Sequence, residues 1–286
     1  MIRLCAFADE ASPSLSGQIR ALRKNGIDLI ELRGVDGKNV SALDDKEAER
    51  IKHELRTAGI RVWSLGSPYG KVSLGDGFDE EALFRQLHRL CRTANILETD
   101  RIRVFSFYDA YDKPDEVVRL LSESVGIASE YNVGLYHENE KDIYGDVTER
   151  VLELRRRVPG LRFVYDPANY IQCNVDPEKS IPALVPGTDY FHIKDAIAET
   201  GELVPAGEGD GRIGDMIGLI DRGVTLTVEP HLSVFAGYSD IDRREMKNKY
   251  TFRSQEEAFD TAVSAVKRLL YKKGHRIGGK NEWKRV

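Results

Sequence analysis

Gly134-Leu-Tyr-His-Glu-Asn-Glu140 is a short apolar run that ends abruptly in acids and an amide. This ending is typical of a buried strand that presents Glu138 at its carboxyl end. Three later stretches combine an apolar run with a polar ending or an embedded histidine, at 161–166, 189–193 and 225–229. The candidate functional side chains of the four stretches are Glu138, Asp166, His192 and Glu229. We therefore predict four strands that carry one shared site.

The rest of the chain continues the same alternation of strand-like and helix-like patterns. Four earlier apolar runs predict strands, at 2–8, 29–32, 60–65 and 102–107. The clearest helix start is Ser254 with Glu257 three positions later, the spacing of a capping box. A doubly wound sheet would place a glycine-rich phosphate turn after the first strand, and none follows Ala6-Phe7-Ala8. The chain therefore predicts an α/β fold, a single-domain (β/α)8 TIM barrel over residues 1–275, with a frayed C-terminal tail at 276–286.

Composition and charge narrow the class of protein. The net charge of -5 is spread in short mixed runs over 286 residues, which gives neither a basic face for nucleic acid nor a polybasic membrane anchor. The three cysteines have no C-x-x-C spacing, so they indicate neither a disulfide framework nor a thiolate zinc site. No signal peptide or membrane-length segment follows Met1. We expect a cytoplasmic protein without nucleic-acid or membrane partners, and a homo-oligomer is left open.

The four candidate side chains suit one divalent metal ion. In a barrel the carboxyl ends of the strands converge on one mouth, so residues about thirty positions apart in sequence meet there. Three carboxylates and one imidazole suit Mn²⁺, Mg²⁺, Co²⁺ or Zn²⁺, and the oxygen-rich set favours Mn²⁺ or Mg²⁺. A lone acid after a strand is more often a helix cap or a solvated loop residue. Four such side chains on consecutive strands favour a shared metal site.

Several motifs resemble those of one protein family. They are Glu138-Asn139, Asp166-Pro-Ala-Asn169-Tyr170, Phe191-His192-Ile-Lys-Asp195, Pro205-Ala-Gly-Glu-Gly-Asp-Gly211 and Val228-Glu229-Pro230. With Ala6-Phe-Ala-Asp9 and Leu29-Ile-Glu-Leu-Arg33, they look like the xylose isomerase-like TIM-barrel family of sugar phosphate isomerases and epimerases, in the AP endonuclease family 2 superfamily. The similarity extends over nearly the whole chain. It implies a TIM barrel, a metal site and a small-molecule sugar or sugar derivative as substrate.

The resemblance also implies a reaction. In the epimerase branch two metal-binding glutamates remove and return a proton next to a carbonyl, and Glu138 and Glu229 match their positions. This implies a metal-dependent sugar isomerase or epimerase that acts through a metal-bound enediolate. That branch commonly has histidine where this chain has Asn169, which keeps open a lyase or dehydratase that acts on a keto-sugar or keto-inositol. A non-catalytic carbohydrate-binding subunit is the third alternative.

The endonuclease IV branch of the same family fits less well. That branch needs a cluster of three metal ions rich in histidine ligands, and this chain has six histidines in all. It also lacks a basic stripe for DNA. We therefore expect a small substrate instead of DNA.

Eight further residues are candidates for substrate contacts: Lys194, Asn169, Glu140, Glu31, Trp63, Phe107, Glu208 and His231. In the resembled family a lysine at the position of Lys194 contacts substrate oxygen or phosphate. Strand alternation directs Glu140 towards the same mouth as Glu138. Two long stretches, 196–212 and 232–253, are predicted to rim this mouth, either as substrate-closing loops or as plain surface insertions.

Overall fold

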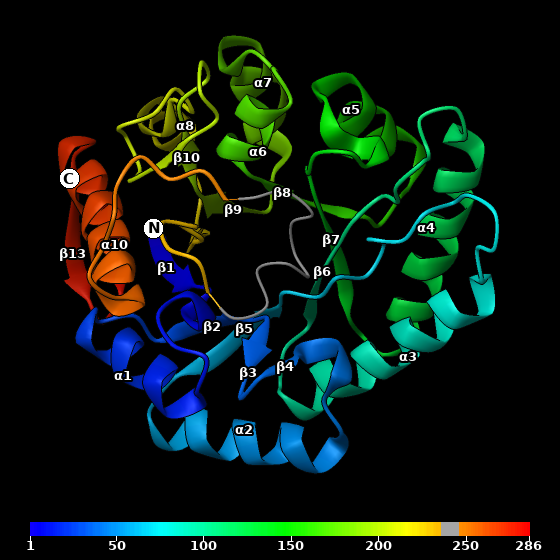
Figure 1. Cartoon of the computed structure of the whole chain (residues 1–286), viewed down its shortest axis with the longest axis horizontal. Coiled ribbons are helices and arrows are strands. Elements are labelled where there is room, and N and C mark those ends of the chain that lie inside the picture. The colour runs from blue at the N-terminus through cyan, green and yellow to red at the C-terminus, as the bar shows by residue number, and fades with distance from the viewer. Residues whose placement is uncertain (236–245) are drawn as a thin grey trace.

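The structure is a computed structural model that describes residues 1–235 and 246–286. Eight parallel strands form its centre: β1 (Ile2–Ala6), β2 (Leu29–Leu32), β5 (Arg61–Leu65), β6 (Arg101–Val104), β7 (Gly134–Glu138), β8 (Arg162–Tyr165), β9 (Tyr190–Ile193) and β12 (Val224–Val228). They follow the order β12-β9-β8-β7-β6-β5-β2-β1, and β12 also pairs with β1, which closes the ring (Figure 1). The predicted single-domain TIM barrel is confirmed.

Helices surround the barrel strands (Figure 1). Their bounds are α1 (Leu15–Lys24), α2 (Asp45–Thr57), α3 (Glu80–Ile96), α4 (Pro114–Glu130), α5 (Thr148–Arg157), α6 (Pro167–Gln172), α7 (Pro177–Leu184), α8 (Ile213–Leu219) and α10 (Gln255–Lys272). The predicted start signal of the last helix is present, because the Ser254 side chain accepts a hydrogen bond from the Glu257 N–H at 3.1 Å. No helix in the described part of the chain is both long and apolar enough to cross a membrane.

The barrel interior holds side chains in layers. Trp63, Tyr136 and Tyr190 pack together in one layer. Successive residues of a strand point to opposite faces, so the residue two positions further along points inward again. On β7 and β9 these residues are Glu138 and His192. An aromatic layer therefore lies beneath the polar side chains at the carboxyl ends of the strands.

The C-terminal residues form a β-hairpin. Its strands are β13 (His275–Gly279) and β14 (Glu282–Arg285), and β14 pairs with the barrel through Ile2 and Trp283. Trp283 is only 2% exposed, and its ring lies 5.1 Å from that of Tyr271 on α10. The prediction of a frayed tail is wrong, because one buried tryptophan anchors this otherwise charged segment to the barrel.

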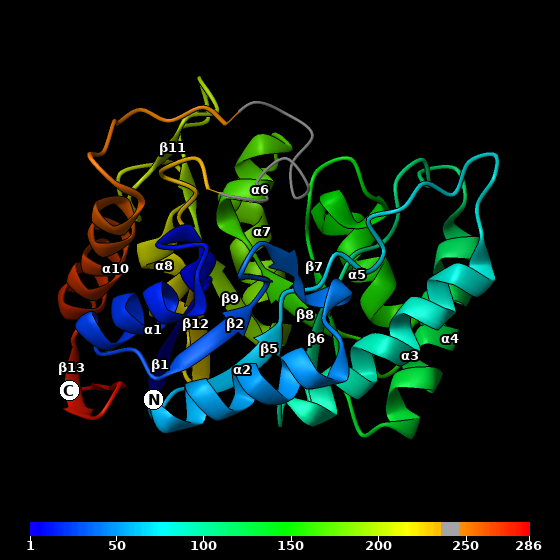
Figure 2. The ribbon, with the colours of Figure 1, turned by 60° about the horizontal axis from the view of Figure 1, so that its bottom comes forward.

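The two long stretches differ in how much of them the structure describes. The first contains a short antiparallel pair, β10 (Asp195–Ala196) and β11 (Leu203–Val204). Figure 2 shows β11 at one end of the barrel and both chain termini at the other. Within the second stretch, residues 236–245 lie outside the described residues, so its predicted role as a substrate-closing loop stays a prediction.

A further short antiparallel pair of strands, β3 (Gly34–Val35) and β4 (Lys38–Asn39), follows β2.

Candidate metal centre

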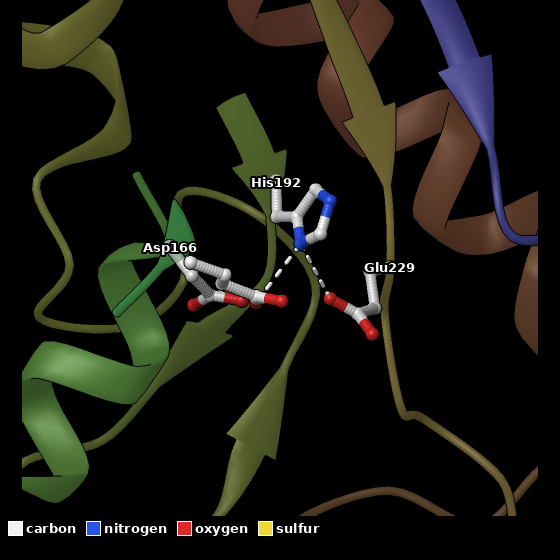
Figure 3. Close-up of side chains that lie close together, drawn as sticks. Asp166, His192 and Glu229 are labelled. Atoms are coloured by element: carbon white, nitrogen blue, oxygen red, sulfur yellow. Dashed lines mark hydrogen bonds and ion pairs between the residues drawn. The ribbon is translucent and has the colours of Figure 1, made fainter. Parts of the chain in front are cut away.

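The four predicted ligands lie together at the carboxyl ends of four adjacent strands. Glu138 ends β7, His192 lies in β9, and Asp166 and Glu229 directly follow β8 and β12. One potential ligand atom from each lies within 4.8 Å of the others, and all four residues are buried. Figure 3 shows the side chains of Asp166, His192 and Glu229 turned towards one another. The parallel order of the strands therefore produces the cluster that the sequence predicts.

Both ring nitrogens of His192 lie within hydrogen-bonding distance of carboxylate oxygens. Its Nδ1 lies 2.9 Å from Glu138 Oε1 and 3.0 Å from Glu229 Oε2, and its Nε2 lies 3.2 Å from Glu31 Oε2. Burial favours the neutral ring, but the charges of Glu138, Glu31 and Glu229 outweigh it and raise the pKa of His192 well above the usual value. Since ionised carboxylates only accept hydrogen bonds, these contacts favour a proton on each ring nitrogen. A metal ion on Nδ1 would take the place of that proton.

Each acid of the cluster is paired with one buried basic side chain. The pairs are Arg33 with Glu229 at 2.8 Å, Arg103 with Glu138 at 3.1 Å, and Lys194 with Asp166 at 3.0 Å. These cations hold carboxylates that would otherwise repel one another where water is excluded. Lys194 is a predicted site residue, whereas the two arginines are not. A buried arginine inside a strand has no sequence signal that separates it from a solvated one.

Burial and the neighbouring cations set different proton affinities for two of the acids. Burial raises the pKa of Asp166 to about 6, despite the nearby charge of Lys194. At Glu229 burial acts in the same direction, but Lys194 and His192 outweigh it and hold the pKa well below the usual value. Glu229 is therefore the more firmly ionised of the two.

The cluster fits a single divalent ion. Asp166 Oδ2 and Glu229 Oε2 are buried and accept no hydrogen bond, although Lys194 Nζ and His192 Nδ1 each lie 3.0 Å from one of them. Ligand atoms around Mn²⁺, Mg²⁺ or Zn²⁺ lie about 2.1 Å from the ion, so opposite ligands are about 4.2 Å apart. The observed spread of up to 4.8 Å needs only a small inward movement. Three carboxylates and one imidazole match the preferences of these ions.

Two asparagines lock the ends of β7 and β8 together. The Asn139 side chain accepts a hydrogen bond from the Asp166 N–H and donates one to the Asp166 carbonyl, both at 2.9 Å. Asn169 Nδ2 donates to the Asn139 carbonyl at 2.9 Å and to Glu138 Oε1 at 3.3 Å. Asp166 Oδ1 caps α6 by accepting from the Asn169 N–H at 3.0 Å, which leaves Oδ2 to face the cluster. Asn169, predicted to contact substrate, thus lies in the centre and also orients its ligands.

Comparison with known proteins identifies the family of this barrel. A sequence model described as xylose isomerase-like TIM barrel matches residues 19–231, a range that includes all four clustered residues. The chain belongs to the xylose isomerase-like TIM-barrel family. No curated protein sequence matches the chain.

Solved structures of xylose isomerase-like barrels superpose on nearly the whole chain. The IOLI protein with a bound zinc atom has 17% sequence identity and a TM-score of 0.73, and the match covers 95% of this chain and 99% of that one. An L-ribulose 3-epimerase has 17% identity and a TM-score of 0.72, with 96% of both chains covered. The probable 3-DHS dehydratase AsbF of Bacillus anthracis has 18% identity and a TM-score of 0.69, with 93% and 99% covered. At these identities the likeness shows the fold.

Within this xylose isomerase-like barrel, five of the predicted substrate residues lie in or next to the cluster. They are Lys194, Asn169, Glu31, His231 and Glu140. His231 Nε2 lies 3.5 Å from Glu229 Oε1, and Glu31 lies behind His192. Burial works against the charged form of Glu140, but Lys71, 3.2 Å away, and Lys194 lower its pKa. Lys71 is a further buried cation that the sequence pattern does not indicate.

Trp63 lies in the aromatic layer and not beside the clustered acids. Its ring packs against Tyr190 at 6.1 Å, and the Arg101 guanidinium lies 4.0 Å from the ring centre. It lines a cavity of about 720 Å³ with Arg3 and Arg61, which stand at the amino ends of their strands. Trp63 therefore faces the opposite end of the barrel from the cluster.

Phe107 and Glu208 are also separate from the clustered side chains. Phe107 is buried and packs against Phe78 at 6.4 Å. Glu208 is exposed and accepts a hydrogen bond from the Tyr250 hydroxyl at 2.9 Å. Within the described ranges 1–235 and 246–286, the structure gives neither residue a hydrogen bond, ion pair or ring contact with the four clustered residues. The structure gives Phe107 a packing role and Glu208 a loop contact.

Proposed function

We propose that this chain is a divalent-metal-dependent sugar isomerase or epimerase that removes a proton from a carbon next to a carbonyl and returns one through an enediolate. One observation carries the proposal: two buried glutamates, Glu138 and Glu229, reach the same nitrogen of His192 at 2.9 and 3.0 Å. They approach from β7 and β12, and β9 lies between these two strands in the barrel order. Two carboxylates on either side of a central position are suited to remove a proton from one face of the substrate and return one from the opposite face.

Glu138, Asp166, His192 and Glu229 would hold the ion, and their oxygen-rich donor set favours Mn²⁺ or Mg²⁺ over Zn²⁺ or Co²⁺. When bound, such an ion acts as a Lewis acid that stabilises negative charge on substrate oxygens. The bound zinc of the IOLI protein supports a metal in a barrel of this fold. The L-ribulose 3-epimerase among the similar structures supports a sugar as substrate.

The chain's own residues supply the proton transfer. Glu229 is ionised, because Lys194 and His192 hold its pKa down, so it is available to accept a proton. Arg103 donates a hydrogen bond to Glu138 Oε2 at 3.1 Å and so fixes the direction of that carboxylate. Lys194 and Asn169 provide N–H groups that orient the hydroxyl or carbonyl oxygens of the substrate. The buried position of these groups excludes water from the reacting carbons.

A lyase that removes water from a keto-sugar or keto-inositol is the second candidate. The Lys194 ammonium group favours it, because this buried N–H donor lies 3.9 Å from Glu229 and can donate a hydrogen bond to a leaving hydroxyl. The dehydratase among the similar structures points in the same direction. The two reactions share the first proton removal and differ in the second step. An epimerase returns the proton, whereas a lyase expels the neighbouring hydroxyl as water.

The deciding experiment loads the purified protein with Mn²⁺ and incubates it in deuterated water with a panel of ketoses, keto-sugars and ketoinositols. Deuterium at a carbon next to the carbonyl, without loss of mass as water, supports the isomerase or epimerase. Loss of water supports the lyase. Glu138→Gln is expected to lower the rate about 10²- to 10⁴-fold. Glu81→Gln changes a glutamate whose side chain is 87% exposed and is the matched control that should keep the rate. Equal rates for wild type and Glu138→Gln would contradict the assigned role of Glu138.

A further inference from the structure

A second group of potential ligands adjoins the first and shares one residue with it. Glu10, Glu229 and His231 each offer one ligand atom within 4.8 Å of the others, and all three are buried. His231 Nε2 lies 3.4 Å from Glu10 Oε1 and 3.5 Å from Glu229 Oε1. Because Glu229 belongs to both groups, the geometry is that of two neighbouring cation positions bridged by one carboxylate.

The guanidinium of Arg33 contacts the same three atoms. Its Nη1 lies 2.8 Å from Glu229 Oε1 and 3.4 Å from His231 Nε2, and its Nη2 lies 3.1 Å from Glu10 Oε1. An ion that bound these atoms at about 2.1 Å would have to displace the guanidinium. The second cation position is therefore taken by a side chain.

Other contacts hold Arg33 in this place. Its Nε and Nη2 donate to the two carboxylate oxygens of Asp9 at 2.8 and 3.0 Å, a bidentate pair. The ring centres of Phe7 and Phe235 lie 4.3 and 4.7 Å from the guanidinium carbon. The Arg33 side chain is only 1% exposed. A guanidinium stays charged at every physiological pH, so this cation is permanent.

We propose that Arg33 is the built-in second cation of the centre and restricts it to one divalent ion. Arg33 binds Oε1 of Glu229, which directs Oε2 towards His192 and the first group of ligands. A permanent charge in the second position also repels any further divalent ion there. This inference rests on the proposed metal site, because it concerns how many ions that site accepts.

Metal stoichiometry tests the inference without any substrate. Equilibrium dialysis against Mn²⁺, followed by elemental analysis, is expected to find one ion per wild-type chain. Arg33→Ala removes the guanidinium from Glu10 Oε1, Glu229 Oε1 and His231 Nε2, so it is expected to bind two ions at the same Mn²⁺ concentration. Electron paramagnetic resonance should then change from the spectrum of an isolated Mn²⁺ to that of a spin-coupled pair, because Glu229 bridges both ions. Arg33→Lys keeps the positive charge and is expected to retain one ion.

Arg103→Ala is the matched control. It also removes a buried arginine next to the cluster, since Arg103 Nη1 lies 3.1 Å from Glu138 and 3.9 Å from Glu229. Arg103 does not bridge the second group, so this variant is expected to bind one ion without spin coupling. If Arg33→Ala does not fold, Arg33→Gln removes the charge but keeps a hydrogen-bonding side chain, and it carries the same expectation of two ions.

The possible outcomes separate the two proposals. Wild-type protein that binds no Mn²⁺ contradicts the proposed metal site and with it the proposed function. Wild-type protein that binds one ion, together with folded Arg33→Ala and Arg33→Gln that also bind one, overturns only the role of Arg33. A wild-type chain that binds two ions in a coupled pair overturns that role as well, because the guanidinium then does not prevent the binding of a second ion.

Discussion

Glu31 contacts His192 on the side of the ring that faces away from the clustered acids. Glu31 Oε2 lies 3.2 Å from His192 Nε2, and its Oε1 accepts a hydrogen bond from the Tyr190 hydroxyl at 2.9 Å. Such a carboxylate fixes the proton on Nε2 and leaves Nδ1 to bind metal. We expect Glu31→Gln to weaken Mn²⁺ affinity about 10- to 100-fold, because an amide is a poorer and less charged acceptor. Isothermal titration calorimetry with Mn²⁺ measures the change.

Glu81→Gln is the control for Glu31→Gln, because it makes the same chemical change at an exposed position. Its Mn²⁺ affinity should equal that of the wild type. If Glu31→Gln also binds Mn²⁺ with wild-type affinity, the orientation of His192 does not depend on this carboxylate. Such a result would not affect the assignment of the four candidate ligands, but it would show that Glu31 does not support the metal site.

Single residues differ in how well their sequence context indicates their position. Glu138, Asp166 and Glu229 each stand at the end of an apolar run, and parallel strands bring such ends together. Arg33 and Arg103 have the composition of surface residues and become recognisable only through the acids that surround them. Their burial depends on contacts between strands far apart in the sequence, which no local pattern records.

At the scale of an element, Asp195 organises the glycine-rich stretch after β9. Its carboxylate accepts hydrogen bonds from the backbone N–H groups of Ala196 at 3.0 Å, Gly207 at 2.7 Å, Gly209 at 3.1 Å and Gly211 at 3.0 Å. A side chain at Gly209 would place its Cβ 2.5 Å from the Ala196 carbonyl oxygen, so the loop can approach this closely only at glycine. The Asp195 carboxylate therefore holds the backbone of this loop in its folded conformation.

We expect Asp195→Asn to destabilise this loop by about 1–3 kcal/mol, because an amide nitrogen cannot accept a backbone N–H and leaves buried donors unpaired. Hydrogen exchange should become faster at Gly207, Gly209 and Gly211 than in the wild type. Asp221→Asn, at an aspartate whose side chain is 90% exposed, should leave these amides unchanged. Unchanged exchange in Asp195→Asn would mean that the loop is held by other contacts.

The C-terminal hairpin is the element that the sequence predicts least well. Its many charges favour a solvated tail, whereas the structure shows that Trp283 is buried between α10 and the barrel. We expect Trp283→Ala to lower the free energy of unfolding by about 3–5 kcal/mol, as for other buried large side chains. Urea denaturation followed by circular dichroism measures the loss. Ile277→Ala on the same hairpin removes an exposed side chain and should change stability little; a large loss there would contradict this account.

At the scale of the whole molecule, the regular alternation of strands and helices, together with the missing glycine-rich turn after the first strand, predicts the barrel. The pairing of β12 with β1 closes the eight parallel strands into a ring in which all carboxyl ends share one face. The position of the four clustered side chains follows from that topology. The reaction does not, because similar structures of the same fold include both an epimerase and a dehydratase.

The proposed ion would join four strands that are neighbours in the ring. Its ligands come from β7, β8, β9 and β12, which make up half of the barrel. The unfolded chain cannot assemble this site, so metal stabilises the native state by mass action. We expect Mn²⁺ at about 100 times its dissociation constant to raise the free energy of unfolding by about 2.7 kcal/mol, and a chelator to reverse the gain. Chemical denaturation with and without Mn²⁺ measures it.

Asp166→Asn removes one charged ligand while its side-chain oxygen can still cap α6 by accepting from the Asn169 N–H. This variant should fold and yet gain much less stability from Mn²⁺ than the wild type. The substitution lowers the affinity for Mn²⁺ but keeps the hydrogen bond that caps α6. An equal gain in both proteins would show that Mn²⁺ acts elsewhere on the molecule. The ring would then be stabilised at a position other than the carboxyl ends of these four strands, and the clustered acids would lose their assignment as metal ligands.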